Sequence, residues 1–129
     1  MTEQKKILIV DDEPDIAKVT MLRLKNAGYQ VINAVNGIQA LEIIEAERPD
    51  LILLDLGLPD IGGAEVYQRM QKNKAIKDTP VIVFSAKHST EITKEELEMP
   101  VEGFLSKPYE PVELLTKIRE ALDNRGQSL

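Results

Sequence analysis

Five short apolar runs, separated by longer amphipathic segments, constrain the fold of this chain most strongly. The runs cover residues 7–10, 31–34, 51–54, 81–84 and, more weakly, 101–105. Continuous runs this short, rich in Ile, Leu and Val, are typical of strands that are buried on both faces. Burial on both faces requires a layer of helices on each side of the sheet.

The segments between the runs carry helical signals. We predict helices over residues 14–27, 37–47, 64–73, 89–98 and 111–123. Pro14 and Pro111 stand where a first helical turn tolerates proline, and Gly28 is a glycine stop after the first helix. Strand and helix therefore alternate five times. This alternation predicts a flavodoxin-like (βα)5 fold of the α/β class, a doubly wound parallel sheet with strand order 2-1-3-4-5 in a three-layer α/β/α arrangement.

The length and composition indicate one globular domain. We place the core of the domain at about residues 5–123, within 1–129, and treat 124–129 as a polar tail. The chain has no cysteine, which excludes thiol chemistry, and its net charge of -6 argues against direct nucleic-acid binding. The first apolar run is too short for a signal peptide or a membrane span. We therefore expect a cytoplasmic protein that does not insert into membranes.

Polar residues follow four of the predicted strands at the points where the strands end. They are Asp11, Asp12 and Glu13 after the first strand, Asp55 after the third, Ser85 and Ala86 after the fourth, and Ser106, Lys107 and Pro108 after the fifth. Because the carboxyl ends of parallel strands share one edge of the sheet, these groups are expected to converge. Carboxylates this close repel one another unless a cation compensates them. Oxygen ligands without histidine or cysteine favour Mg²⁺, which is often completed by a phosphate.

Taken singly, most of these residues have structural explanations. Acidic residues before a helix favour its N-terminus, Lys107-Pro108 fits an ordinary loop, and Ser85 fits a turn. We expect His88, the only histidine, to be exposed to solvent. Asp55 is the exception, because a carboxylate that ends a buried apolar run needs a partner. The predicted convergence favours a functional interpretation for the others.

In the segments "ILIVDDEPDI", "DLGLPDIGG", "VFSA" and "LSKPY" the chain resembles the receiver domain of two-component response regulators, over about residues 5–123. The resemblance implies that Asp55 accepts a phosphoryl group from a sensor histidine kinase or a histidine phosphotransfer protein. It also implies that Asp12, Asp55 and the main-chain carbonyl of Gly57 bind Mg²⁺, with Asp11 holding a coordinated water.

By the same resemblance, Lys107, the Ser85 hydroxyl and the Ala86 N–H contact the phosphoryl oxygens. Phosphoryl transfer depends mainly on positioning and positive charge, which suits these groups. In receivers the peptide bond equivalent to Lys107-Pro108 is usually cis, and we expect a cis bond here. Gly57 and Lys87 stand at positions that tune the lifetime of the aspartyl phosphate, and their expected effects oppose each other.

The resemblance further implies a switch in which the Ser85 hydroxyl moves toward the phosphoryl group and Phe104 turns inward behind it. Since phenylalanine has no hydroxyl to hydrogen-bond in either position, we expect its ring to lie inward already before phosphorylation. The face formed by helix 4, strand 5 and helix 5 would then bind a downstream protein or effector domain. The domain would be a monomer or a phosphorylation-dependent dimer.

The chain departs from the usual receiver pattern at "MPVEGFL". Pro100 stands where most receivers have a glycine and cannot reproduce a left-handed helix cap. The helix predicted over residues 89–98 is therefore expected to end by Glu98 or Met99 and to be short or mobile.

Other functions remain open from the residues alone. A haloacid-dehalogenase-like Mg²⁺-dependent phosphatase also uses a strand-end aspartate and a lysine, but its general-acid aspartate would stand where this chain has Gly57. A flavodoxin-like FMN binder would need a Ser/Thr/Gly loop after the first strand, and a phosphorylation-independent receiver would not need the complete pocket. We expect a signalling module that is no enzyme beyond its own phosphorylation and dephosphorylation, either of the stand-alone chemotaxis or phosphorelay type or cut from a longer regulator.

Overall fold

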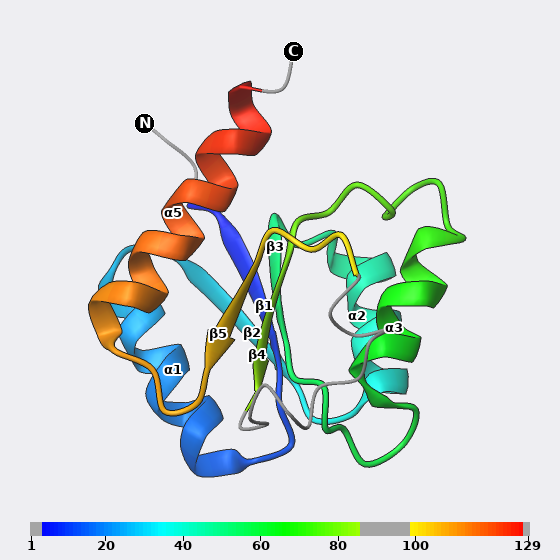
Figure 1. The fold of residues 1–129 in the computed structure, drawn as a ribbon, viewed down its shortest axis with the longest axis horizontal. Helices are drawn as coiled ribbons and strands as arrows, with labels where there is room; N and C mark the ends of the chain where they lie inside the picture. The colour runs from blue at the N-terminus through cyan, green and yellow to red at the C-terminus, as the bar shows by residue number, and fades with distance from the viewer. Residues whose placement is uncertain (1–3, 86–98, 128–129) are drawn as a thin grey trace.

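The computed structural model describes residues 4–85 and 99–127. Its elements follow the chain as β1 Lys6–Val10, α1 Pro14–Asn26, β2 Gln30–Ala34, α2 Gly37–Glu47, β3 Leu51–Leu54, α3 Gly62–Gln71, β4 Val81–Ser85, β5 Gly103–Ser106 and α5 Pro111–Gln127 (Figure 1). The strands form one parallel sheet in the order β2-β1-β3-β4-β5, which confirms the predicted fold class and topology. The helix predicted over 89–98 lies outside the described residues.

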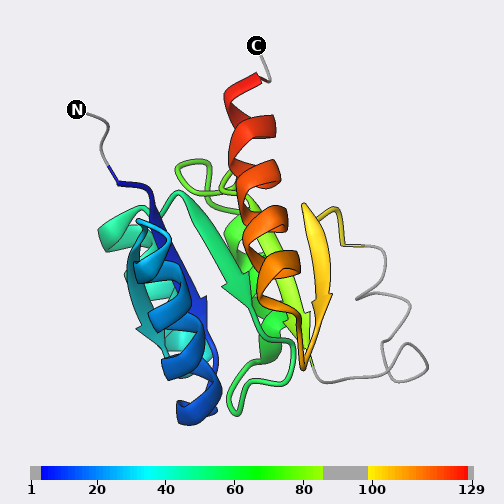
Figure 2. The same cartoon turned by 90° about the vertical axis from the view of Figure 1, so that its left-hand side faces the viewer.

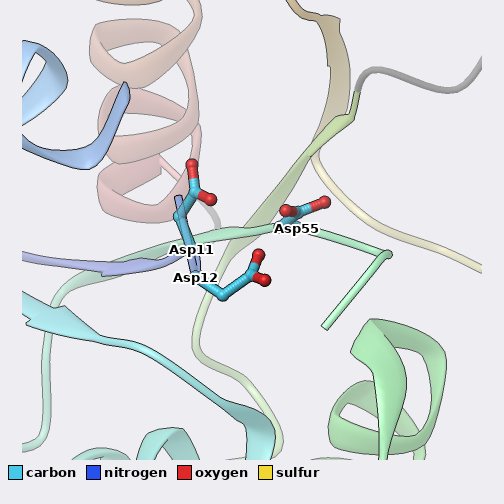
Figure 3. A group of neighbouring side chains, drawn as sticks. All are labelled: Asp11, Asp12 and Asp55. Atoms are coloured by element: carbon cyan, nitrogen blue, oxygen red, sulfur yellow. The ribbon is translucent and has the colours of Figure 1, made fainter. Parts of the chain in front are cut away.

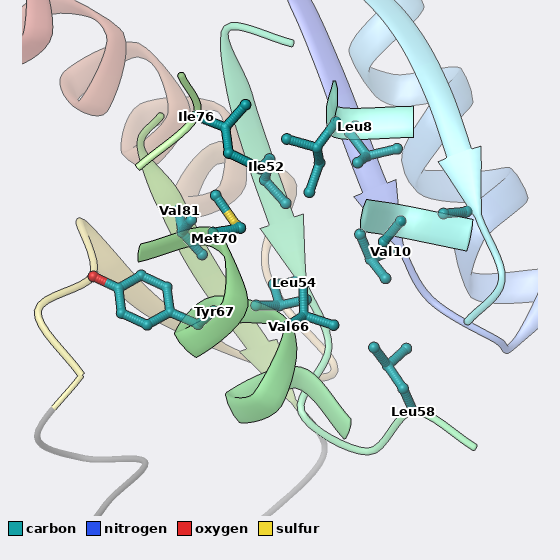
Figure 4. Close-up of a cluster of buried hydrophobic side chains, with 13 residues drawn as sticks. Leu8, Val10, Ile52, Leu54, Leu58, Val66, Tyr67, Met70, Ile76 and Val81 are labelled. Atoms are coloured by element: carbon teal, nitrogen blue, oxygen red, sulfur yellow. The ribbon is translucent and has the colours of Figure 1, made fainter. Parts of the chain in front are cut away.

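Helices cover both faces of the sheet. In Figures 1 and 2, α1 and α5 lie on one face, and α2 and α3 lie on the other. Successive strand residues point to opposite faces, so each central strand contributes to two cores. Leu8, Val10, Ile52 and Leu54 belong to the core under α2 and α3 (Figure 4), and Ile7, Ile9, Leu51 and Leu53 belong to the core under α1 and α5. This double burial explains why the apolar runs are continuous and not alternating.

The first helix ends where the sequence predicts a glycine stop. Gly28 has a φ of 98°, a left-handed conformation that a side chain disfavours. Its N–H donates to the carbonyl of Lys25, and the N–H of Tyr29 donates to the carbonyl of Leu24. These bonds satisfy the last carbonyls of α1 and turn the chain into β2.

Four of the described helix boundaries differ from the sequence prediction: α1 ends at Asn26 and not at 27, α3 covers Gly62–Gln71 and not 64–73, and α5 ends at Gln127 and not at 123. The third helix begins at Gly62, two residues before the predicted start, because the glycines seat the helix directly on the end of β3. A Cβ at Gly63 would lie 2.4 Å from the carbonyl oxygen of Asp55. At the other end of the chain, α5 continues to Gln127, four residues past its predicted end at 123. Since Leu114 and Ile118 already anchor this helix in the core, further turns propagate at little cost.

The segment before β5 is shaped by Pro100. Met99 and Pro100 belong to no helix, whereas the predicted helix over 89–98, with its end, lies outside the described residues. The hydroxyl of Tyr67 donates to the carbonyl of Pro100 at 3.3 Å, and the N–H of Val101 donates to the carbonyl of Met99 at 2.8 Å. Because of this turn, β5 begins at Gly103, two residues after its predicted start. Across the part of the chain described here, no helix is both long and apolar enough to cross a membrane.

Candidate functional site

Asp11 and Asp55 stand directly after β1 and β3, at the carboxyl edge of the sheet. The N–H of Asp11 donates to the carbonyl of Ala34 and the N–H of Asp55 donates to the carbonyl of Val10, both at 3.0 Å. The backbone of both aspartates is therefore held by the sheet itself. Their residues are 1% and 5% exposed, so two carboxylates are buried side by side at the switch point of the topology.

Asp12 joins these two residues to form an acidic cluster. One carboxylate oxygen from each of Asp11, Asp12 and Asp55 lies within 4.8 Å of the others (Figure 3). Asp12 is exposed, whereas the other two are buried, so the cluster opens to solvent on one side only. Three carboxylate oxygens at this spacing, with an open side for water or phosphate, match the chemistry of a Mg²⁺ site.

The ammonium of Lys107 compensates the buried carboxylates. Its Nζ lies 2.9 Å from Oδ2 of Asp11 and 3.2 Å from Oδ2 of Asp55, and the lysine side chain is 4% exposed. Burial lowers the pKa of Lys107, but the hydrogen bonds and charges of Asp11 and Asp55 outweigh burial and raise this pKa above its ordinary value. The ammonium also lies 4.5 Å from the centre of the Phe84 ring. Lys107 is therefore positively charged at neutral pH.

Backbone N–H groups fix the second oxygen of each buried carboxylate. The N–H of Gly57 donates to Oδ1 of Asp55 at 3.1 Å, and the N–H of Glu13 donates to Oδ1 of Asp11 at 3.0 Å. Each bond closes a short turn between an aspartate and the residue two positions later. The Oδ2 atoms are thereby directed toward Lys107.

Ser85 and Lys107 come from the ends of neighbouring strands. The N–H of Lys107 donates to the carbonyl of Ser85 at 2.8 Å, and Ser85 is 6% exposed. The structure thus brings together Asp11, Asp12, Asp55, Ser85 and Lys107, with Gly57 on the adjoining loop. Ala86, Lys87 and His88 lie outside the described residues.

Comparison with known proteins identifies the family. The family model of the response regulator receiver domain matches residues 7–119. The chain belongs to the receiver domain family. It is thus a phospho-accepting signalling module of two-component systems, a class that binds Mg²⁺ and interacts with histidine kinases and downstream effectors. The haloacid-dehalogenase alternative receives no support from these similarities.

Individual relatives agree with this assignment. The chain is 36% identical over 122 residues to the phosphate regulon transcriptional regulatory protein PhoB of Pseudomonas aeruginosa, covering 95% of this chain and 53% of that protein. A CheY-like receiver domain protein from Methanospirillum hungatei is 32% identical with a TM-score of 0.89, over 98% of this chain and 100% of that one. The chain spans about half the length of the curated relatives it matches.

A third relative shows the same fold around a metal. The receiver domain of the sensor histidine kinase PA1611 from Pseudomonas aeruginosa was solved with a magnesium ion coordinated in its active site cleft. It is 26% identical to this receiver, with a TM-score of 0.88, over 94% of this chain and 99% of that one.

Two further expectations for this receiver can be compared with the structure. The Lys107-Pro108 peptide bond is cis, as the resemblance implies. The expectation that Phe104 lies inward is wrong for this structure, in which the residue is 37% exposed. Leu105 packs in the core under α1 and α5, so Phe104 points to the other face of this edge strand, where it is partly exposed to solvent.

One link in this receiver, between the loop after Asp55 and the start of α2, was not predicted from the sequence. The carboxylate of Asp60 accepts the N–H of Gly37 at 2.7 Å and the N–H of Ile38 at 2.8 Å. Partial desolvation raises the pKa of Asp60, but these and other backbone hydrogen bonds outweigh it and lower this pKa below its ordinary value. An aspartate after a proline is also an ordinary turn residue, so its sequence position carries no distinct signal.

Glu13 also lies beside the site, although the family resemblance assigns it no role. Its Oε1 lies 3.7 Å from the Nζ of Lys107, although its side chain is 54% exposed. The signal was present in the sequence, because Glu13 completes the acidic triplet after the first strand.

Proposed function

We propose that Asp55 is the residue that accepts the phosphoryl group, from a phosphohistidine on a sensor histidine kinase or a histidine phosphotransfer protein. A carboxylate oxygen of Asp55 forms a bond to phosphorus while the bond from phosphorus to the histidine nitrogen breaks. The leaving imidazole keeps the bonding electrons and takes up a proton. The observation that supports this proposal most is the Lys107 ammonium, which lies between the carboxylates of Asp11 and Asp55 beside an open acidic cluster.

We further propose that Asp12, Asp55 and the main-chain carbonyl of Gly57 hold Mg²⁺, and that Asp11 holds a coordinated water. The oxygen-only donor set and the exposed side of Asp12 support this assignment. Mg²⁺, when bound, would supply positive charge close to the phosphoryl oxygens. Asp11 is buried and forms an ion pair with Lys107, which fits a residue that holds a metal-bound water and does not bind the metal directly.

In this proposal Lys107 exchanges partners when Asp55 is phosphorylated. Its ammonium leaves the Asp55 oxygen at 3.2 Å and pairs with a phosphoryl oxygen, while it keeps its contact with Asp11. The Ser85 hydroxyl and the Ala86 N–H would donate to the remaining oxygens. The backbone hydrogen bond from the Lys107 N–H to the Ser85 carbonyl supports this joint role, because it holds the ends of the neighbouring strands β4 and β5 together beside the pocket.

The proposed output is a change of surface shape. Phe104 pairs in register with Val83 on β4, two residues before Ser85, so a movement of the Ser85 hydroxyl can leave space for the exposed ring. Helix 4, β5 and α5 would then present a new face to a downstream protein or effector domain, in a monomer or a phosphorylation-dependent dimer. Gly57 and Lys87 would tune the phosphate lifetime in opposite directions.

The proposal also covers the extent of the domain, its location and its downstream partner. Residues 1–129 would form one cytoplasmic domain that binds no nucleic acid itself, does not insert into membranes and has no catalytic role beyond its own phosphorylation and dephosphorylation. Its curated relatives are about twice as long and are named transcriptional regulators, so an attached effector domain is one candidate for the downstream partner. A stand-alone phosphorelay receiver is the other.

Small-molecule phosphorylation tests the proposal. Incubation with radiolabelled acetyl phosphate and Mg²⁺ is expected to label the wild-type protein and not Asp55→Asn, and EDTA is expected to abolish labelling. The matched control is Asp78→Asn, which neutralises an exposed aspartate in the turn before β4. Equal labelling of wild type and Asp55→Asn, or labelling that does not depend on Mg²⁺, would contradict the proposal.

A further inference from the structure

Thr20 places a hydroxyl on the buried face of α1. Its residue is 0% exposed, and Ala17 and Leu24 on the same face are apolar and equally buried. A buried hydroxyl is costly unless it is hydrogen-bonded, and valine would fill the same space without that cost. The partner of the Thr20 hydroxyl is the hydroxyl of Tyr109, which is 89 residues away in the sequence.

Tyr109 belongs to the connection between β5 and α5, two residues after Lys107. Its ring packs against the core under α1 and α5, and its hydroxyl reaches Thr20. The ends of this connection are held by backbone bonds, from the Lys107 N–H to the carbonyl of Ser85 and from the Leu114 N–H to the carbonyl of Glu110. The hydroxyl pair holds the middle of the connection against α1.

The first helix therefore meets this connection at two points. At its start, Oε1 of Glu13 lies 3.7 Å from the Nζ of Lys107, and two turns later Thr20 meets Tyr109. A groove of about 500 Å³ runs along the same junction and is lined by α1 residues and by Lys107, Pro108 and Tyr109. The connection therefore borders solvent on this side, where the hydroxyl pair adds a specific contact to the packing of the Tyr109 ring.

The position of Lys107 depends on this connection. Its ammonium donates to the carboxylate of Asp11 at 2.9 Å and to that of Asp55 at 3.2 Å. A small shift of the Lys107 backbone would lengthen one or both of these contacts. Groups that stabilise charge lose much of their effect when displaced by an ångström. A restraint two residues away therefore acts directly on the pocket.

We infer that Thr20 and Tyr109 are positioning residues for Lys107: their hydroxyl pair holds the β5–α5 connection on α1 and so keeps the ammonium between Asp11 and Asp55. The expected effect on the rate of Asp55 phosphorylation rests on the proposed function, whereas the effect on the position of Lys107 does not. The hydroxyl pair is accordingly required for full protection of the Lys107 amine and for the full rate at which Asp55 is phosphorylated.

Lysine acetylation with sulfosuccinimidyl acetate, measured residue by residue by mass spectrometry on the folded protein, tests the inference directly. Tyr109→Phe and Thr20→Val each remove one hydroxyl and keep the shape, whereas Thr20→Ser keeps the hydroxyl. We expect Lys107 to be acetylated about 3- to 10-fold faster in the first two variants, the factor that corresponds to one neutral hydrogen bond. The double variant should add little to either single change, because one interaction is lost in each.

Tyr67→Phe is the matched control, because it removes a tyrosine hydroxyl that donates to Pro100 on the other face of the sheet. Lys107 in Tyr67→Phe and in Thr20→Ser should stay protected as in wild type. Exposed Lys72 serves as the reference for reagent activity, and half-buried Lys117 on α5 reports general unfolding.

Each outcome decides the inference. Unchanged Lys107 acetylation in Tyr109→Phe and Thr20→Val overturns it, and so does an equal rise at Lys117, which would indicate loss of structure. The selective rise at Lys107 supports it. The rate of phosphorylation by acetyl phosphate, measured on the same proteins, should fall by a similar factor; wild-type protein that accepts no phosphoryl group would overturn the proposed function while the acetylation result still stands.

Discussion

The ammonium of Lys107 and a carboxylate oxygen of Asp11 lie 2.9 Å apart, and both side chains are almost completely buried, at 4% and 0% exposed. A buried ion pair adds little stability by itself, because desolvation offsets the attraction, but removal of one partner leaves the other charge uncompensated. The same ammonium also forms an ion pair with Oδ2 of Asp55 at 3.2 Å. The stability of the domain without a metal ion should therefore depend on Lys107.

Replacing the lysine tests this dependence. Lys107→Met keeps the length of the side chain and removes its charge, and we expect the free energy of unfolding in EDTA to fall by about 2–4 kcal/mol. Mg²⁺ should restore more stability to this variant than it adds to wild type, because a cation then replaces the missing charge. Urea unfolding with and without Mg²⁺ measures both effects. Lys72→Met, at an exposed site, is the control, and an equal Mg²⁺ effect in Lys107→Met and wild type would argue against charge compensation.

Gly63 is predicted to be required for the close approach of α3 to the end of β3. A Cβ there would lie 2.4 Å from the Asp55 carbonyl oxygen and 2.9 Å from the Leu56 Cα, so backbone must move. Gly63→Ala should lower the free energy of unfolding by about 1–3 kcal/mol, as for other overpacked sites. Gly103→Ala is the matched control, since a Cβ there would meet no atom within 4 Å apart from its neighbours in the chain. Similar urea midpoints for the two variants would show that the contact is easily relieved.

Asp60 provides a prediction about pH. Its pKa is lowered in the folded state by the N–H groups of Gly37 and Ile38, despite an opposing effect of desolvation. A lowered folded pKa means that the carboxylate contributes stability above its unfolded pKa, about 3.9, and that this contribution is lost as the pH falls through the folded pKa. Wild type should therefore be more stable than Asp60→Ala at pH 7, and the difference should shrink below about pH 4.

Urea unfolding across this pH range measures the difference. Asp78→Ala, which truncates an exposed aspartate outside this link, is the control and should show no comparable dependence. A stability difference between wild type and Asp60→Ala that stays constant from pH 7 to acid pH would contradict the proposed origin of the effect.

The ring of Phe104 is predicted to become buried on activation. The chain has two phenylalanines, of which Phe84 is fully buried and Phe104 is 37% exposed. Incorporation of 4-fluorophenylalanine should therefore give two ¹⁹F signals of different solvent accessibility, which Phe104→Leu assigns. Beryllofluoride with Mg²⁺ should reduce the accessibility of the Phe104 signal and leave Phe84 protected. An unchanged Phe104 signal in protein that binds beryllofluoride would exclude this ring from the switch.

Local patterns predicted the sheet and the main charges of the site. The runs that became β1 and β3 are continuous because both faces are covered, and this property is visible in the sequence. Asp11, Asp55 and Lys107 could be placed together because parallel strands end at one edge. These inferences need only the order of elements along the chain.

Contacts between residues that are far apart in the sequence could not be predicted in the same way. The bond between Thr20 and Tyr109 joins residues 89 positions apart, and each residue alone fits an ordinary helix or loop. Close packing on the Asp55 carbonyl requires a glycine at Gly63, and nothing in the local sequence indicates this contact. The exposure of the Phe104 ring depends on how closely other parts of the fold cover it, and the sequence around β5 does not show this.

The most direct test of the account is the chemical localisation of the phosphoryl group. Borohydride reduces an acyl phosphate and converts the phosphorylated aspartate to homoserine, which peptide mass spectrometry locates. After treatment with acetyl phosphate and Mg²⁺, we predict homoserine at residue 55 alone, with Asp11 and Asp12 unchanged, and none when Mg²⁺ is omitted. Homoserine at Asp11 or Asp12, or no conversion at Asp55 in the presence of Mg²⁺, would contradict the assignment of Asp55 as the phosphoryl acceptor.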